Sequence, residues 1–206
     1  LLYGAESDRL YIYVHGKNGS KEEAFRFAGI AAKSGYQVLS FDLAEHGERK
    51  SDPRPCNVPG SKDDLKAIYA FVQKRYKSIS LYACSLGAYF TLMAWPDVQF
   101  ERCLFLSPLL DMERLIRNMM QWAGVSEREL QEKGEIETSF GETLSREYFR
   151  YVCDHPVIQW NSPTFILCGE HDNVTEKSIL ETFTTKYNCQ TEIMPGGEHY
   201  FHTPEQ

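Results

Sequence analysis

Ser85 lies in the stretch YACSLGAYF (82–90), with Ala83 two residues before it and Gly87 two residues after it. A run of β-favouring residues precedes this serine and a helical pattern follows it, which is the context of the G-x-S-x-G nucleophile elbow. The elbow turn is so tight that both flanking positions need small residues, although Ala83 replaces the usual glycine. Such a turn would display the Ser85 hydroxyl for attack on an acyl carbon. Cys84 is a rival nucleophile, but the spacing to Gly87 selects Ser85.

A serine hydroxyl needs a histidine base, and the histidine needs an acid that orients it. The sequence offers both after predicted strands, because FILCGEHDNVT contains Asp172 and TEIMPGGEHYFH contains His199. Loops at the carboxyl ends of parallel strands meet at one edge of a sheet, so we expect these two side chains to converge there. The close approach that two glycines before it allow favours His199. The rival candidates are Glu170 for the acid, and His171 and His202 for the base.

Two backbone N–H groups are candidates for stabilising the oxyanion of a tetrahedral intermediate. The N–H of Leu86 follows Ser85 at the start of the predicted helix. The second candidate is the N–H of Lys17 in the loop HGKNG (15–19), whose glycines would let the backbone approach a substrate oxygen. Three polar side chains are predicted to fix loops in place and not to react: His15, Asp42 and His46.

The elements that must position these residues alternate between strands and helices. Strands are predicted by short apolar runs at Leu10–His15, Gln37–Phe41, Ser78–Ala83, Arg102–Leu106, Thr164–Cys168 and Gln190–Met194, with a weaker one near residues 1–4. Ser20 with Glu23, and Ser61 with Asp64, predict capping boxes that open two helices. A third helix is expected from about Leu86 to Trp95, before Pro96. This alternation predicts βαβ units in an α/β fold with a mainly parallel, doubly wound sheet.

After the fourth clear strand the alternation is interrupted. Helical patterns follow at Met112–Ala123, Glu127–Lys133 and Arg146–Cys153, with GEIETSFGETL between the last two as an irregular loop or short hairpin. We expect an inserted, mainly helical cap at 108–155 within a single domain of residues 1–206. Met119 and Trp122, on the first of these helices, are candidate substrate-binding residues because they could line an acyl pocket.

The pieces HGKNG, FDLAEHGE, ACSLGAY, CGEHDNVT and GGEHYFH resemble the α/β-hydrolase superfamily, in the family's order from residue 15 to 202. The likeness is closest to small, bacterial-type serine hydrolases of esterase or peptidase-like character. The resemblance implies the α/β-hydrolase fold, acyl transfer through a covalent acyl-serine, no cofactor, and Asp172 as the acid. The sequence departs from the family at Ala83, and the last packing helix after His199 is expected to be shortened or missing.

The length, charge and composition of the chain indicate which kinds of binding partner to expect. A length of 206 residues fits one domain, and a net charge of -7 argues against a general nucleic-acid binder. No apolar run approaches the roughly 20 residues that span a bilayer. Because LLYGAESDRL lacks a basic region followed by an apolar one, we do not expect it to be a signal peptide. The six cysteines show no metal-ligand spacing and are typical of a reducing cytosol. We expect a cytoplasmic protein with a small-molecule acyl substrate and no metal, nucleic-acid or membrane partner; the sequence indicates no oligomeric state.

The sequence therefore predicts a serine hydrolase that cleaves a small carboxylic ester or thioester. Ser85 would attack the acyl carbon, His199 would move the proton, and Asp172 would hold the imidazole. Two alternatives stay open. One is a binding or regulatory module that keeps the fold without turnover, since fold does not imply function. The other is an acyl transferase, lyase or peptidase that uses the same three residues.

Overall fold

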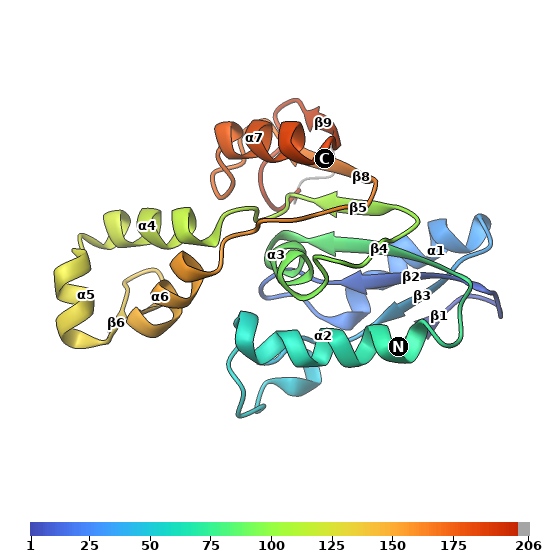
Figure 1. Cartoon of the computed structure of the whole chain (residues 1–206), viewed down its shortest axis with the longest axis horizontal. Helices are drawn as coiled ribbons and strands as arrows, with labels where there is room; N and C mark the ends of the chain where they lie inside the picture. The colour runs from blue at the N-terminus through green and yellow to red at the C-terminus, as the bar shows by residue number, and fades with distance from the viewer. Residues whose placement is uncertain (202–206) are drawn as a thin grey trace. The chain divides into compact units, whose positions relative to one another are not determined.

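A seven-stranded sheet is the centre of the computed structural model, which describes residues 1–201 (Figure 1). Its strands lie in the order β1 (Leu2–Tyr3), β3 (Gln37–Ser40), β2 (Arg9–Val14), β4 (Ser78–Cys84), β5 (Cys103–Leu106), β8 (Thr164–Gly169) and β9 (Gln190–Met194). Every neighbouring pair is parallel except β1 with β3. The predicted mainly parallel sheet is confirmed, and each predicted strand from residue 10 onward agrees within one residue at either end.

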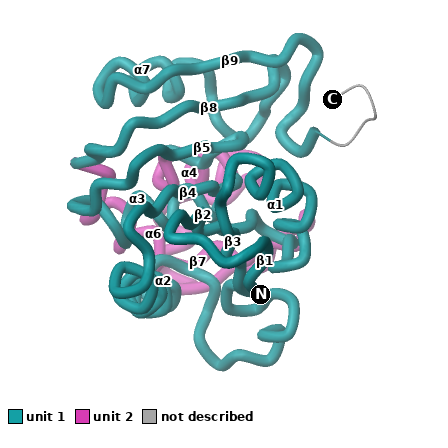
Figure 2. The backbone as a smooth tube through the Cα atoms, turned by 90° about the vertical axis from the view of Figure 1, so that its right-hand side faces the viewer, with its two compact units in different colours: residues 1–110, 159–206 teal, residues 111–158 magenta. Residues whose placement is uncertain are grey.

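Helices cover both faces of this sheet, as the doubly wound prediction requires. Figure 2 shows α1 (Ala24–Lys33) on one side and α2 (Val58–Val72), α3 (Ser85–Ala94) and α7 (Lys177–Tyr187) on the other. In strand β2 the side chains on both faces of the sheet are buried. Tyr11 and Tyr13 belong to a cluster with α1 residues, whereas Leu10, Ile12 and Val14 alternate with them and are fully buried.

Two helix starts differ from the sequence prediction. Ser20 makes no side-chain cap, because a short 3₁₀ turn, η1 (Lys21–Glu23), precedes α1. Helix α2 begins at Val58 and not at Ser61, because the Asn57 side chain accepts the N–H of Gly60 at 2.9 Å. Helix α3 ends before Pro96 as expected. Helix α7 was not predicted from the sequence.

Residues Asp111–Ile158 form a second compact unit, shown in magenta in Figure 2. It contains α4 (Met112–Ala123), α5 (Glu127–Lys133), α6 (Arg146–Asp154) and a hairpin of β6 (Glu135–Glu137) with β7 (Thr143–Ser145). Each helix begins at a side chain that accepts a backbone N–H of the first turn, namely Asp111, Ser126 and Ser145. The unit occupies the part of the chain where the sequence predicts a cap, and its role as a cap stays a prediction.

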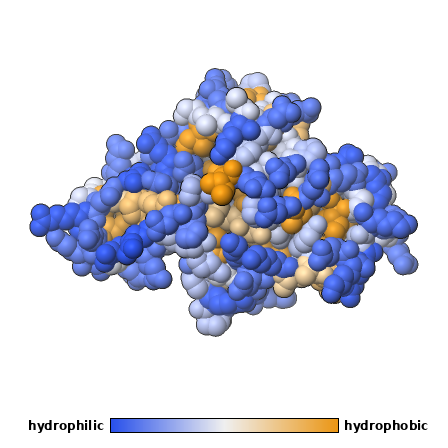
Figure 3. Space-filling view, in the orientation of Figure 1, coloured by the Kyte–Doolittle hydropathy of each residue, from blue (hydrophilic) through white to orange (hydrophobic). Residues whose placement is uncertain are grey.

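Polar and charged residues dominate the face of the molecule seen in Figure 3, with small apolar patches among them. Exposed apolar side chains include Phe25, Ile30, Phe71 and Ile158. Within residues 1–201, no helix combines the length and the apolar character that crossing a membrane needs. Scattered apolar side chains of this kind are ordinary on a protein surface.

Candidate active site

Ser85 stands at the turn between β4 and α3 in a backbone conformation that serine rarely adopts. Its φ is 46°, in the left-handed region. The turn brings the first residues of α3 against the end of β2. A Cβ on Gly87 would overlap the carbonyl oxygen of His15 and lie 2.8 Å from that of Val14. Position 87 therefore needs glycine, which gives the sequence motif a direct physical cause.

We expect Gly87→Ala to destabilise the fold by about 3 kcal/mol or more, because the methyl group would overlap backbone atoms that cannot rotate away. For a chain of this size, that loss corresponds to a fall of roughly 6 °C or more in Tm. Thermal melting followed by circular dichroism would measure it.

Gly29→Ala is the matched control, because a Cβ on Gly29 in α1 meets nothing within 4 Å. It should leave Tm unchanged or raise it slightly, since alanine favours a helix. Equal melting temperatures for the two variants would show that Gly87 is not tightly packed.

Ser85, His199 and Asp172 form one continuous chain of hydrogen bonds. The hydroxyl of Ser85 lies 2.8 Å from Nε2 of His199, and Nδ1 of His199 lies 2.8 Å from Oδ2 of Asp172. A carboxylate only accepts, so Nδ1 carries the proton and Nε2 is left to accept from the serine hydroxyl. The other carboxylate oxygen accepts the backbone N–H groups of Val174 at 2.9 Å and Thr175 at 3.0 Å.

The carboxyl group of Asp172 is buried and yet favours its charged form. The exposed fractions of the His199 and Asp172 side chains are 3% and 4%. Burial alone would raise the pKa of Asp172, but the hydrogen bond and the charge of His199, with two backbone N–H donors, outweigh it and lower the pKa. Asp172 can therefore stay ionised beside the imidazole and stabilise a positive charge on it.

The chain is similar to known proteins in structure, but no match was found to its sequence. No protein-family model and no curated protein matches the sequence. Among solved structures, Est1E from Butyrivibrio proteoclasticus with ferulic acid bound aligns with TM-score 0.76 and 20% identity, covering 98% of this chain and 85% of that one. A monoacylglycerol lipase from Paleococcus ferrophilus aligns with TM-score 0.71 and 17% identity, covering 100% and 91%.

An alpha-beta serine hydrolase homologue from Coxiella burnetii also aligns, with TM-score 0.63 and 20% identity, covering 96% of this chain and 79% of that one. The chain has the α/β-hydrolase fold. In an α/β-hydrolase fold the nucleophile, the acid and the base are expected in that order along the sequence. Ser85, Asp172 and His199 follow this order: Ser85 begins α3 directly after β4, and the other two lie in loops after β8 and β9.

Close contacts between glycines hold the loop after β9, which contains His199. A Cβ on Gly169, at the end of β8, would overlap the backbone of Gly197. The N–H of Gly197 donates to the carbonyl of Met194 at 3.0 Å, and Gly196 has a φ of 67° that favours glycine. The two glycines thus let the loop after β9 turn back against β8, which carries His199 toward Asp172.

The rival candidates have other roles or lie elsewhere. The carboxylate of Glu170 accepts the N–H of Gly196 at 2.8 Å, so it supports the loop that carries the histidine. His171 is exposed, and His202 lies outside the described residues. Burial raises the pKa of the Cys84 thiol to about 12, so the thiolate that a cysteine nucleophile needs is scarce at neutral pH.

The two predicted oxyanion donors belong to segments that adjoin Ser85. Leu86 is in the first turn of α3, where backbone N–H groups have no acceptor within the helix. The loop with Lys17 passes directly beside the elbow, because a Cβ on Gly16 would lie 3.2 Å from Cβ of Ser85. Donation from these two N–H groups to a substrate stays a prediction.

Two buried histidines brace this loop: His15, as the sequence predicts, and His46, which was predicted to fix the loop after β3. Nε2 of His15 accepts the N–H of Leu43 at 3.0 Å, and Nε2 of His46 accepts the N–H of Asn18 at 3.0 Å. Burial lowers the pKa of His15, which keeps its ring neutral and able to accept. Asp42 also fixes the loop after β3, because its carboxylate accepts two backbone N–H groups.

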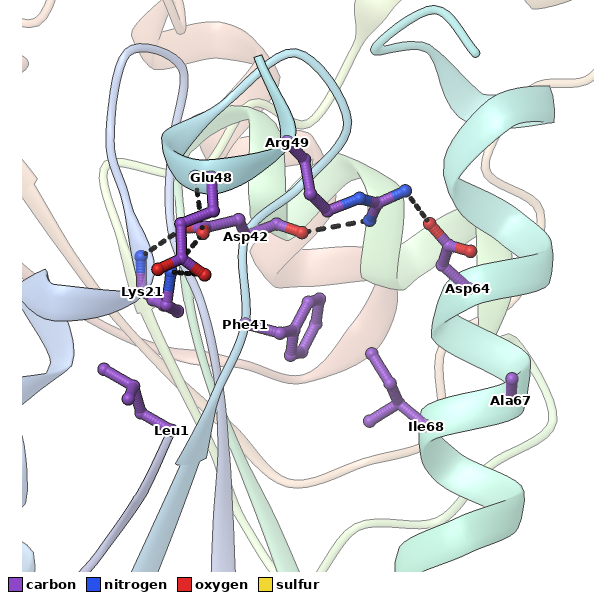
Figure 4. A pocket seen from close by; sticks show the side chains of 9 residues that line it. All are labelled: Leu1, Lys21, Phe41, Asp42, Glu48, Arg49, Asp64, Ala67 and Ile68. Carbon is purple, nitrogen blue, oxygen red and sulfur yellow. Dashed lines mark hydrogen bonds and ion pairs between the residues drawn. The ribbon is translucent and has the colours of Figure 1, made fainter. Parts of the chain in front are cut away.

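A pocket of about 500 Å³ lies beside Asp42, as Figure 4 shows. Its lining consists of Leu1, Lys21, Phe41, Asp42, Glu48, Arg49, Asp64, Ala67 and Ile68. Its charged groups bind one another: Nζ of Lys21 lies 2.5 Å from Asp42, and Arg49 lies 2.7 Å from Asp64. None of the predicted site residues lines it. Among the described residues, no group of three or more His, Cys, Asp or Glu side chains could hold a metal ion.

Met119 and Trp122, the predicted substrate-binding residues, both lie on α4 of the second unit. Met119 is half-buried, whereas Trp122 is 57% exposed and its ring contacts that of Phe140 edge-on at 6.3 Å between centroids. Their part in substrate binding stays a prediction. Thr175, a partner of Asp172, was not among the residues predicted from the sequence. The aspartate itself could have suggested this bond, because aspartate side chains often accept backbone N–H groups two or three residues ahead.

Proposed function

We propose that the protein is a serine hydrolase that cleaves a small carboxylic ester or thioester through an acyl-Ser85 intermediate. The observation that carries this proposal is the unbroken hydrogen-bond chain from Ser85 through His199 to Asp172. The similar structures support it, because their names include an esterase-type protein with ferulic acid bound, a monoacylglycerol lipase and a serine hydrolase homologue.

The proposed reaction has two halves. Ser85 Oγ attacks the acyl carbon while Nε2 of His199 takes its proton, and the imidazolium then protonates the leaving alcohol or thiol. Water next attacks the acyl-serine, gives a proton to His199, and the carboxylic acid leaves as Ser85 regains its hydrogen. Asp172 stays ionised throughout, and the N–H groups of Leu86 and Lys17 stabilise the oxyanion in both halves.

Labelling and turnover together test this proposal. A fluorophosphonate should modify Ser85 in the wild-type protein and fail to modify Ser85→Ala. Hydrolysis should then be measured on p-nitrophenyl esters, acyl-coenzyme A thioesters and aminoacyl amides. Labelling without turnover of any of these would favour a transferase, whereas neither labelling nor turnover would favour a binding module. Preferred cleavage of the amides would identify a peptidase.

We propose further that the second unit contributes to acyl-chain selection through Met119 and Trp122. Met119→Ala and Trp122→Ala should then raise KM for an octanoyl ester by about tenfold, because each removes apolar contact area worth roughly 1–3 kcal/mol. Kinetics on acetyl, butyryl and octanoyl esters would measure the change, with the acetyl ester affected least.

Phe140→Ala serves as the comparison, because Phe140 contacts Trp122 from the hairpin of the same unit. If these residues only stabilise the unit, all three variants would lower the melting temperature and reduce activity on every ester by a similar factor. That uniform fall would remove α4 from substrate selection.

A further inference from the structure

The three residues Ser107–Leu109, which directly follow β5, connect separate parts of the candidate site. The N–H of Leu109 donates to the carbonyl oxygen of Ser85 at 3.1 Å. The N–H of Ser107 donates to the carbonyl oxygen of Leu167 on β8 at 2.8 Å. Ser107 is fully buried and has a φ of 40°, a strained conformation that persists only where the surroundings fix it. This segment, called the β5 turn below, is thus tied to the nucleophile elbow on one side and to β8 on the other.

Thr175 ties the acid to the same turn. Its hydroxyl donates to the carbonyl oxygen of Pro108 at 2.7 Å, across 67 residues of sequence. Its backbone N–H donates to Oδ1 of Asp172 at 3.0 Å. The side chain is 5% exposed, so water competes little for either bond. One residue therefore joins the carboxylate of Asp172 to the segment that also holds Ser85.

The order of the strands explains why such a tie matters. Ser85 follows β4 and Asp172 follows β8, and β5 lies between these strands in the sheet. The imidazole of His199 is a rigid spacer with a hydrogen bond of 2.8 Å at each end. If the loop carrying Asp172 shifts relative to the elbow, one of the two bonds must lengthen. The β5 turn lies between these two strands and is bonded toward both sides, so it can set the distance between Ser85 and Asp172.

We propose that Thr175 is a positioning residue that holds Asp172 at the correct distance from Ser85 through its hydroxyl bond to the β5 turn. This inference rests on the proposed hydrolase function. Thr175 does not touch the reacting atoms and acts through Asp172 and His199. Its loss should therefore lower kcat and leave substrate binding nearly unchanged.

Thr175→Val removes the hydroxyl and keeps the volume of the side chain. We expect kcat on a small ester to fall about tenfold or more with KM changed less than about twofold, because small displacements at a reacting centre are costly. Thr175→Ser keeps a hydroxyl and should return kcat to within about threefold of the wild type. Thr175→Ala removes the same hydroxyl from a smaller side chain and replaces the valine variant if that variant does not fold.

Thr91→Val is the matched control. Thr91 is fully buried in α3, and its hydroxyl donates to the carbonyl of Ala88 at 2.7 Å, the same length as the bond from Thr175. A purely structural role for Thr175 predicts that both valine variants lower Tm and kcat to the same extent. The proposal predicts similar melting temperatures with a fall in kcat for Thr175→Val alone.

The proton on Nδ1 of His199 gives a readout that needs no turnover. In the wild type it should give a low-field proton NMR resonance, which Asp172→Asn removes. Thr175→Val should shift or broaden this resonance and Thr175→Ser should restore it. Wild-type kcat and an unchanged resonance in Thr175→Val would overturn the proposal. If the wild type hydrolyses nothing and Ser85 is not labelled, the proposed function fails, and the resonance still decides whether Thr175 positions Asp172.

Discussion

Ser85→Ala is expected to lower kcat by a factor of about 10⁶, as loss of the nucleophile does in a serine hydrolase. The fold should survive, because alanine keeps the Cβ against which Gly16 packs and loses only one hydroxyl. That hydroxyl bonds to His199, so the loss in free energy of unfolding should be about 1 kcal/mol. Single-turnover kinetics and thermal melting would measure the two effects separately.

Cys84→Ala is the control for this prediction, since the two residues are adjacent and their side chains are similar in size. With its pKa raised to about 12 by burial, the Cys84 thiol is protonated at neutral pH and should contribute little to turnover. Most of the activity should therefore remain. A Ser85→Ala protein with more than about a tenth of the wild-type kcat would show that another group is the nucleophile.

Asp172→Asn should reduce kcat by about 10⁴ while the protein stays folded. The structure explains both parts of this expectation. The Oδ1 position can still accept the N–H groups of Val174 and Thr175, so the loop keeps its hydrogen bonds. The amide nitrogen then faces Nδ1 of His199, which must accept and not donate. The imidazole is thereby held in the tautomer that places its proton on Nε2, where it cannot accept the proton of Ser85.

Glu170→Gln tests the rival acid under matched conditions, since it makes the same chemical change two residues away. The carboxylate of Glu170 accepts one backbone N–H, from Gly196, and a glutamine oxygen can accept the same bond. We expect kcat within about threefold of the wild type, because this substitution leaves the imidazole tautomer unchanged. A larger loss for Glu170→Gln than for Asp172→Asn would move the acid to Glu170.

The parts of the structure that local signals determine could be predicted from the sequence. The strands show as short apolar runs because both faces of the sheet are covered. The bounds of α4 and α5 could be predicted because their ends have local signals. Asp111 and Ser126 accept N–H groups of the first turn, and Gly124 ends α4 in the left-handed conformation. Ser85 stood out for a similar reason, since the tight turn restricts both of its flanking residues.

Features that depend on contacts between distant residues could not be predicted. Helix α7 contains three threonines and a phenylalanine, whose helix propensities are low, and it is stabilised by burial of Leu180 and Phe183. Ser61 was predicted as the cap of α2, but it is 2% exposed within the helix, and this burial could not be recognised from the local sequence. The bond from Thr175 to Pro108 spans 67 residues and leaves no local pattern.

Among residues 1–201, strand β9 lies at the edge of the sheet and pairs with β8 alone, and His199 lies in the loop that follows it. Ser85, by contrast, follows β4, which is flanked by strands on both sides. Edge strands open locally at a smaller free-energy cost than central ones. Opening of β9 alone would withdraw His199 while Ser85 stays in place. We therefore expect the proposed hydrolase activity to be lost at a lower temperature and denaturant concentration than the fold, and amide hydrogens of β9 to exchange with solvent well before those of β4.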